Sequence, residues 1–282
     1  GRKHSWTVLD VSETEAKRSA KAPFITSTLQ QTASSRLGFA PSRTMGIAQK
    51  LYESGHITYM RTDSTNLSKV ALSQIYSVIE KKYGKEYLEP HTFTSKSKNA
   101  QEAHEAIRPT DMTKMSAGLN DEQQKLYELI WGRTMASQMT DAKMMRTKIT
   151  ATVAGAEDFP KFSANGSRLL FPGWLIADPD GGGEDVNLPK VNVGEKLKLI
   201  DLQAEEKATE PPGRYSDAGL IKKIEKRGIG RPSTYASIIK TIQDRGYVEK
   251  INKALTPTDT GDVVSSFLEK YFMNYISDSF TA

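Results

Sequence analysis

The chain has 282 residues, of which 37% are hydrophobic and 26% charged, and its formal charge is +5 at pH 7. It contains no cysteine, which excludes disulfides, thiolate zinc sites and a cysteine nucleophile. No run of about 18 apolar residues is present, which argues against a membrane-spanning helix. The first six residues lack the apolar stretch of a signal peptide, and we therefore expect a cytoplasmic protein.

The first part of the chain predicts one strand followed by helices. A strand is expected over residues 5–11, and the pattern is helical from Phe24 to about Met145. Three amphipathic helices are indicated there, with Ser42, Ser68 and Asn120 as N-caps and with Gly55 and Gly84 ending the first two. The first of these helices is expected to bury one face formed by Met45, Ala48, Leu51 and Tyr52.

The pattern changes to strands at Arg146, where apolar and polar residues begin to alternate. Asn165-Gly166 predicts a hairpin turn between short strands, and residues 191–202 are expected to form more strand. A Pro-Pro-Gly linker at residues 211–213 ends this region.

The C-terminal part predicts a helix capped by Ser216, a glycine-containing loop and a second helix capped by Ser233. A small hairpin over residues 247–258 and a helix from Gly261 follow. This order is typical of a winged-helix-like DNA-binding unit.

The predicted fold class is α+β multidomain. Residues 1–22 and 146–210 form a β-rich domain, and residues 23–145 form an all-helical domain inserted into it. Residues 211–282 form a partial, winged-helix-like helical domain.

The positive charge is confined to two blocks. Residues 1–70 hold 10 basic and 5 acidic residues, and residues 214–253 hold 10 basic and 4 acidic residues. The remaining stretches are net acidic. Such segregation is typical of a protein that meets a polyanion along chosen faces, although lysine-rich helix surfaces can produce the same count.

Tyr59 and Arg61 form the first candidate site. They stand two residues apart in a short β-like segment, which predicts that both side chains lie on the same side. A tyrosine is a nucleophile, but its free pKa of about 10 keeps it protonated at neutral pH. Arg61 could favour the phenolate and stabilise a phosphorane-like transition state. On spacing alone, a half-buried strand tyrosine beside a surface arginine remains the simpler interpretation.

His104 and Arg108 form the second candidate. In a helical turn they would share one face and offer donors to a phosphodiester. A helix zinc motif fails because its second histidine would fall at Arg108. A capped surface helix is the alternative.

The third candidate is the loop from Arg227 to Thr234. Gly228 and Gly230 allow close approach to a phosphate, and a helix N-terminus at Ser233 offers free N–H groups. An ordinary helix–loop–helix turn is the alternative. The acidic residues Asp178, Asp180, Glu184 and Asp185 lack calcium-loop spacing and predict a solvated loop, not a metal site.

Four stretches together resemble a bacterial type IA DNA topoisomerase I. They are PFITSTLQQ at 23–31, ITYMRTDS at 57–64, EAHEAIRP at 102–109 and RGIGRPSTYA at 227–236. Their order over some 210 residues makes the resemblance specific, and it outweighs the simpler interpretations above.

The resemblance implies that Tyr59 and Arg61 are catalytic, with Tyr59 forming a 5′-phosphotyrosine bond to a single DNA strand. It implies DNA contacts for His104, Arg108, Arg227, Ile229, Gly230, Arg231, Ser233 and Thr234. It further implies that the helical domain lifts on the β hinge within a toroidal core, so that another strand passes. The partners would be single-stranded and negatively supercoiled DNA, and the protein would be monomeric, cytoplasmic and nucleoid-associated.

The chain departs from the family's pattern in lacking a Toprim-type acidic motif and cysteine-rich zinc ribbons. We therefore expect a central fragment that binds no metal itself, with Mg²⁺ held in the full-length enzyme by the Toprim domain. Alone, this fragment is expected to be inactive in DNA relaxation.

Three alternatives fit less well. A tyrosine recombinase keeps its nucleophile after an H-x-x-R motif, whereas Tyr59 precedes His104 and the His–Arg spacing is one residue longer. A rolling-circle relaxase needs a His-hydrophobe-His pair, which the sequence lacks. A winged-helix DNA-binding protein without catalysis explains residues 214–260 but not residues 23–145.

Overall fold

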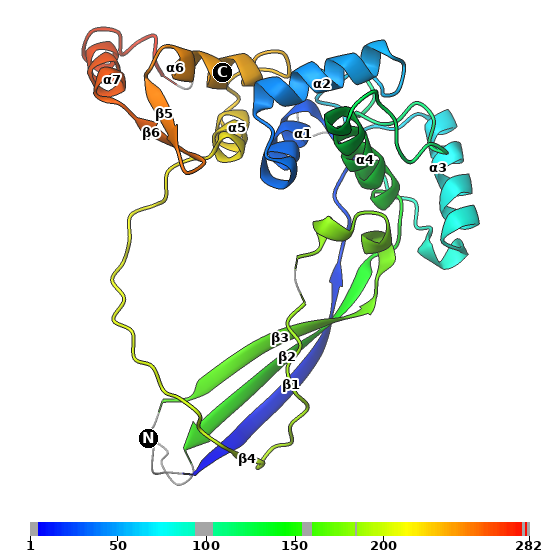
Figure 1. The fold of residues 1–282 in the computed structure, drawn as a ribbon, viewed down its shortest axis with the longest axis vertical. Coiled ribbons are helices and arrows are strands. Elements are labelled where there is room, and N and C mark those ends of the chain that lie inside the picture. Colours follow the sequence, from blue (N-terminus) through cyan, green and yellow to red (C-terminus); the bar gives the residue numbers. More distant parts are fainter. Residues whose placement is uncertain (1–4, 94–103, 154–159, 184, 278–279, 281–282) are drawn as a thin grey trace. The chain divides into compact units, whose positions relative to one another are not determined.

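The computed structural model describes residues 5–93, 104–153, 160–183, 185–277 and 280. The chain divides into two compact units. One contains Gly1–Ala20 and Met139–Pro211, and the other contains Lys21–Gln138 and Pro212–Ala282. Strands dominate the first unit and helices the second (Figure 1), so the expected α+β content is confirmed.

The first unit is a four-stranded antiparallel sheet of order β3-β2-β1-β4. Its strands are β1 Trp6–Arg18, β2 Ala142–Val153, β3 Phe162–Phe171 and β4 Lys196–Leu197. Short 3₁₀ turns at Gly173–Ile176 and Pro179–Gly181 follow β3. Trp174 is buried and its Nε1 donates to the Arg18 carbonyl at 2.7 Å, which closes one end of the sheet.

Three expectations about this sheet are wrong. β1 is longer than the expected strand over residues 5–11, and only Lys196–Leu197 of the 191–202 region is strand. Asn165-Gly166 lies inside β3 and makes no turn. A glycine is required at position 166 for a different reason. A Cβ there would come within 2.6 Å of the Val186 carbonyl oxygen.

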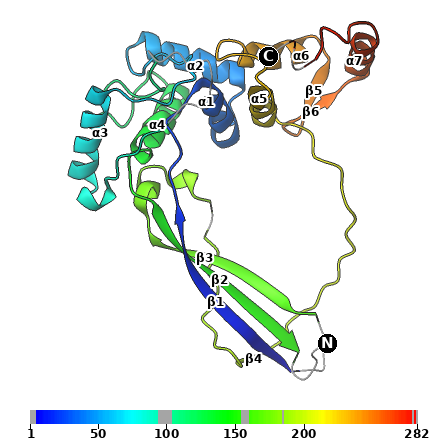
Figure 2. The ribbon, with the colours of Figure 1, turned by 180° about the vertical axis from the view of Figure 1, so that it is seen from behind.

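The second unit begins with four α-helices, α1 Thr26–Thr32, α2 Pro41–Glu53, α3 Lys69–Lys82 and α4 Asp121–Ala136. A π-helical turn, Ala33–Leu37, extends α1, and a 3₁₀ turn, Lys85–Tyr87, follows α3. Figure 2 shows α2 and α4 from behind, and their buried faces join α1 in the core. The largest fully buried side chains of this unit include Phe24, Leu29, Leu51, Ile57, Met60, Ile75, Leu126 and Ile130.

Most predicted helix ends are confirmed. Ser68 Oγ accepts from the Ala71 N–H, Asn120 Oδ1 accepts from the Gln123 N–H, and Gly55 and Gly84 follow the ends of α2 and α3 with positive φ. The predicted cap Ser42 is wrong. Ser42 lies inside α2, which begins at Pro41 after the N-cap Ala40, and the missing N–H of a proline costs nothing at the first helical position.

The C-terminal segment of this unit has α5 Asp217–Lys226, α6 Tyr235–Asp244, β5 Val248–Ile251, β6 Ala254–Pro257 and α7 Asp259–Tyr271. Ser216 caps α5 as predicted, whereas α6 is preceded by Thr234 and not by Ser233. Asn252 and Lys253 have φ of 47° and 67°, and they form the two-residue turn of the β5–β6 hairpin. Among the described residues, no helix is long and apolar enough to cross a bilayer.

Candidate functional site

A cavity of about 420 Å³ in the helical unit brings the three predicted site segments together. Its lining residues come from residues 59–63, from residue 104 and from the loop before α6. They are Tyr59, Arg61, Thr62, Asp63, His104, Arg231, Pro232 and Ser233. Tyr59 and Arg231, which are 172 positions apart in the sequence, therefore line the same cavity.

The segment carrying Tyr59 lies outside any helix or strand, and its side chains alternate between solvent and core. Tyr59 is 43% exposed and Arg61 is exposed, whereas Met60 and Thr62 are 1% and 3% exposed. The buried residues anchor the segment, and the exposed residues point toward the cavity side. This is the same-side arrangement expected for Tyr59 and Arg61.

Thr26 of α1 holds the backbone on both sides of Arg61. Its Oγ1 donates to the Met60 carbonyl at 2.8 Å and accepts from the Thr62 N–H at 2.9 Å. Its own N–H donates to the Thr62 carbonyl at 2.9 Å. Thr26 is fully buried. These bonds hold the main chain on both sides of Arg61 and fix its direction.

Thr58 ties the other side of Tyr59 to residues 106–108. Its N–H donates to the Arg108 carbonyl at 2.9 Å, and its Oγ1 donates to the Ala106 carbonyl at 2.7 Å. The Arg108 N–H in turn donates to Thr58 Oγ1 at 3.0 Å. Tyr59 is thus fixed between two anchored threonines, Thr58 and Thr62.

Tyr52 is a site neighbour that the sequence did not reveal. It was expected on the buried face of α2, but it is 40% exposed and its ring meets that of Tyr59 edge-on. The ring centroids are 5.2 Å apart and the planes lie at 66°. This contact restricts the Tyr59 ring to one side. A surface tyrosine at the end of a helix carries no sequence signal for such a role.

His104 and Arg108 do not share a helix face, because residues 104–109 are non-helical and form bridges to Phe24 and Ile57. The exposed His104 lines the cavity, but Arg108 does not. The Arg108 Nη2 forms an ion pair with Glu105 Oε2 at 2.7 Å, and Nη1 donates to the Pro109 carbonyl at 2.9 Å. Burial alone would raise the pKa of the Glu105 carboxyl. The hydrogen bonds from Arg108 and Ser68 have the larger combined effect, and the pKa of Glu105 is lowered from its ordinary value.

The loop between α5 and α6 is shaped by glycines. Gly228 has φ of +74°, and the Ile229 N–H bonds back to the Ile224 carbonyl, which ends α5 in a Schellman motif. Gly230 has φ of +80° and lies against Tyr235. Arg227, Ile229, Gly230 and Thr234 shape this loop but do not line the cavity.

Arg231 stabilises the same loop. Its Nη1 donates to the Gly228 and Gly230 carbonyls at 2.9 and 2.7 Å. Its N–H donates to Thr234 Oγ1 at 2.8 Å. The guanidinium is therefore held at the cavity with its planar fork pre-oriented.

No group of three or more His, Asp or Glu side chains among the described residues could hold a metal ion.

Comparison with known proteins decides the family. A family model described as DNA topoisomerase matches residues 2–282. The chain belongs to the DNA topoisomerase family. It is 48% identical to DNA topoisomerase 1 of Salmonella typhimurium, covering 99% of this chain and 33% of that protein. It is 46% identical to DNA topoisomerase 1 of Mycobacterium tuberculosis, covering 98% of this chain and 32% of that protein.

A solved structure of the family has the same fold. Full-length topoisomerase I from Thermotoga maritima matches with a TM-score of 0.85 at 39% identity, over 99% of this chain and 47% of that one. The chain thus spans about a third of the length of the curated DNA topoisomerases that it matches.

Proposed function

We propose that this chain carries the cleavage tyrosine of a type IA DNA topoisomerase, which relaxes negatively supercoiled DNA without ATP. The observation that carries the proposal is the single cavity that unites Tyr59, Arg61, His104 and Arg231. A nucleophile and three side chains that can bind phosphate around one space suit phosphoryl transfer. Membership of the family supports the same reaction.

In this reaction Tyr59 Oη attacks the phosphorus of a phosphodiester in a single DNA strand. The new O–P bond forms as the bond from phosphorus to the 3′ oxygen breaks. The tyrosine loses its proton, and the departing 3′ oxygen gains one. The products are a 5′-phosphotyrosine link and a free 3′-hydroxyl, and the reverse attack rejoins the strand.

Arg61 is the residue best placed to stabilise the negative charge on the non-bridging oxygens of the phosphate in the transition state. Within the part of the chain that the structure describes, its guanidinium makes no ion pair or side-chain hydrogen bond. The charge is available to a ligand without breaking an existing pair. The backbone bonds made by Thr26 supply the pre-organisation that electrostatic stabilisation requires.

The remaining predicted residues divide into two groups. His104, Arg231 and Ser233 line the cavity and would contact the strand directly. A second group would hold those contacts in place, with Arg108 acting through its pair with Glu105. The others in this group are Arg227, Ile229, Gly230 and Thr234, which shape the loop.

We extend the proposal to the whole enzyme. Residues 23–145 form a helical domain inserted in a β hinge of residues 1–22 and 146–210, and residues 211–282 are winged-helix-like within a toroidal core. The helical domain lifts on the hinge for strand passage. Magnesium would be held by a Toprim-type domain of the longer protein, which acts on single-stranded and supercoiled DNA as a monomer.

Covalent trapping tests the proposal. The full-length enzyme that contains this chain is incubated with end-labelled single-stranded DNA and denatured, and we expect a protein–DNA adduct in which the label position reports a 5′-phosphotyrosine. Tyr59→Phe should abolish the adduct, whereas Tyr52→Phe keeps a competent nucleophile and should retain it. An adduct that persists in Tyr59→Phe contradicts the assignment. DNA binding without any adduct would favour the non-catalytic winged-helix alternative.

A further inference from the structure

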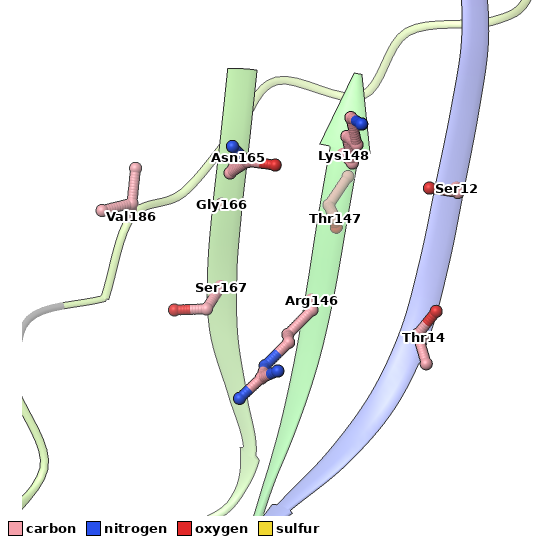
Figure 3. A pocket seen from close by; sticks show the side chains of 9 residues that line it. All are labelled: Ser12, Thr14, Arg146, Thr147, Lys148, Asn165, Gly166, Ser167 and Val186. Atoms are coloured by element: carbon pink, nitrogen blue, oxygen red, sulfur yellow. The ribbon is translucent and has the colours of Figure 1, made fainter. Parts of the chain in front are cut away.

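A second cavity, of about 570 Å³, lies in the sheet unit on β1, β2 and β3. Figure 3 shows its lining side chains. Two cross-strand rows make up most of it. The strand register places Ser12, Lys148 and Asn165 in one row and Thr14, Arg146 and Ser167 in the next.

All six side chains lie on one face of the sheet. Directly paired residues of an antiparallel sheet share a face, and so do residues two apart in one strand. In Figure 3, Arg146 extends its guanidinium toward the β3 side, and Lys148 stands further along the same strand. Each basic residue is flanked by short hydroxyl or amide groups that can donate hydrogen bonds.

The two cations are available to a ligand. Arg146 and Lys148 are exposed, and neither makes an ion pair or side-chain hydrogen bond within the described part of the chain. None of the cavity's lining residues is acidic. Asp10, one row beyond Ser12 on the same face, bounds the cationic area.

The opposite face has a different charge pattern. Its rows carry Glu13, Glu15 and Lys17 on β1, Lys143 on β2 and Arg168 on β3, so carboxylates and cations are interspersed there. Of the three basic residues of β2, Arg146 and Lys148 lie on the cavity face, and Lys143 lies on the opposite face, paired with Lys17. The cavity face differs in presenting two neighbouring cations with no acidic residue among its lining, which suits an anion with repeated charges.

The spacing of the cations selects the ligand class. Residues two apart in a strand lie about 6.8 Å apart, which is comparable to the spacing of successive phosphates along an extended single strand. A single phosphate would need both cations to converge on one point, whereas a strand offers each cation its own phosphate. Hydroxyl and amide neighbours match phosphate oxygens and carry no base-edge pattern.

We propose that this face of the β1–β2–β3 sheet is a binding site for the phosphodiester backbone of a DNA strand, contacted by Arg146 and Lys148. The site lies in a different compact unit from the Tyr59 cavity. It goes beyond the cleavage chemistry proposed above, because it needs neither Tyr59 nor a cut strand.

Salt dependence of binding tests this site. Single-stranded DNA binding is measured over a range of salt concentrations for the parent, Arg146→Ala, Lys148→Ala and the double variant. The slope of log affinity against log salt is negative, and each lost phosphate contact should reduce its magnitude by about 0.7, so that the double variant loses about 1.4. Arg168→Ala removes the same charge from the opposite face and should leave the slope unchanged.

Covalent trapping of the same variants separates this proposal from the cleavage assignment. Arg146→Ala and Lys148→Ala should still form the Tyr59 adduct with a short oligonucleotide that reaches only the cavity. The sheet site is refuted if the double variant has the same salt slope as the parent. It is also refuted if Arg168→Ala reduces the magnitude of the slope as much as Arg146→Ala or Lys148→Ala does. Absence of an adduct in the parent would refute the cleavage chemistry and leave the slope measurement valid. Thermal unfolding confirms that each variant is folded.

Discussion

Ser27 of α1 donates a hydrogen bond from its Oγ to Oε1 of Glu225, near the end of α5. The two residues are 198 positions apart. Gln31 Nε2 lies 3.5 Å from the other carboxylate oxygen of Glu225. Because Thr26, the residue before Ser27, holds the backbone around Arg61, one helix joins the Tyr59 segment to the loop that follows α5.

The first prediction concerns Glu225. Glu225→Ala removes the acceptor for Ser27, which is 1% exposed, and should lower the free energy of unfolding by about 1–3 kcal/mol. Because the carboxylate bonds to Ser27 and Gln31 of α1 and is not among the residues that line the cavity, we expect slower adduct formation at saturating DNA with little change in DNA affinity. Glu225→Gln keeps an acceptor oxygen and should recover most of the rate. An unchanged rate in Glu225→Ala would show that α1 does not position the loop.

The second prediction concerns Thr26. Thr26→Val keeps the shape but leaves the buried Thr62 N–H without its acceptor, which should cost about 1–3 kcal/mol of stability in urea unfolding. Adduct formation should fall as well, because Arg61 loses its backbone anchor. Thr241→Val, at an exposed position of α6, is the control and should change neither quantity measurably. Equal stability of the two variants would rule out the anchoring role.

The third prediction concerns Gly230. Its φ of +80° disfavours any side chain by about 1–2 kcal/mol, and an added Cβ would lie 3.1 Å from both Ile238 Cδ1 and Tyr235 Cδ1. Gly230→Ala should therefore displace Arg231 and weaken binding of single-stranded DNA. Gly213→Ala is the control, since a Cβ there meets nothing within 4 Å. Matching affinities in a filter-binding assay would mean that the loop tolerates a different backbone conformation.

Local patterns in the sequence predicted helix caps well and the position of strands less well. Ser68 and Asn120 could be recognised as caps because each acts within four residues of chain. The predicted turn at Asn165-Gly166 was wrong. A glycine that is required because the Val186 carbonyl passes close to it cannot be distinguished in the sequence from a glycine that forms a turn. His104 and Arg108 suggested a helix by spacing, but their segment bridges to Phe24 and Ile57, which are remote in sequence.

For the candidate site as well, local sequence patterns identified some residues, and tertiary contacts revealed others. Tyr59 and Arg61 were found through their two-residue spacing and the motif around them, whereas Tyr52 and Thr26 were not. Both act on residue 59 or its neighbours through tertiary contacts, and neither contact leaves a periodic pattern. The Ser27–Glu225 bond is invisible to sequence reasoning for the same reason.

The fourth prediction concerns pH and the ion pair of Glu105 with Arg108. Burial raises the pKa of Glu105, but hydrogen bonds from Arg108 and Ser68 outweigh it and hold the folded-state pKa below its ordinary value. The ionised carboxylate is thus favoured in the folded state. Its contribution to stability is complete above the unfolded pKa of about 4.3 and is lost as pH falls through the folded pKa.

Urea unfolding of the parent and Glu105→Gln across acidic pH measures this contribution. The variant should be less stable at neutral pH, and the difference should shrink below about pH 4 as the parent carboxylate is protonated. Glu80→Gln, an exposed position of α3, is the control and should show no comparable pH-dependent difference. A constant difference between parent and Glu105→Gln across the acidic range would mean that packing, and not the charge on Glu105, fixes the 104–108 segment beside Tyr59.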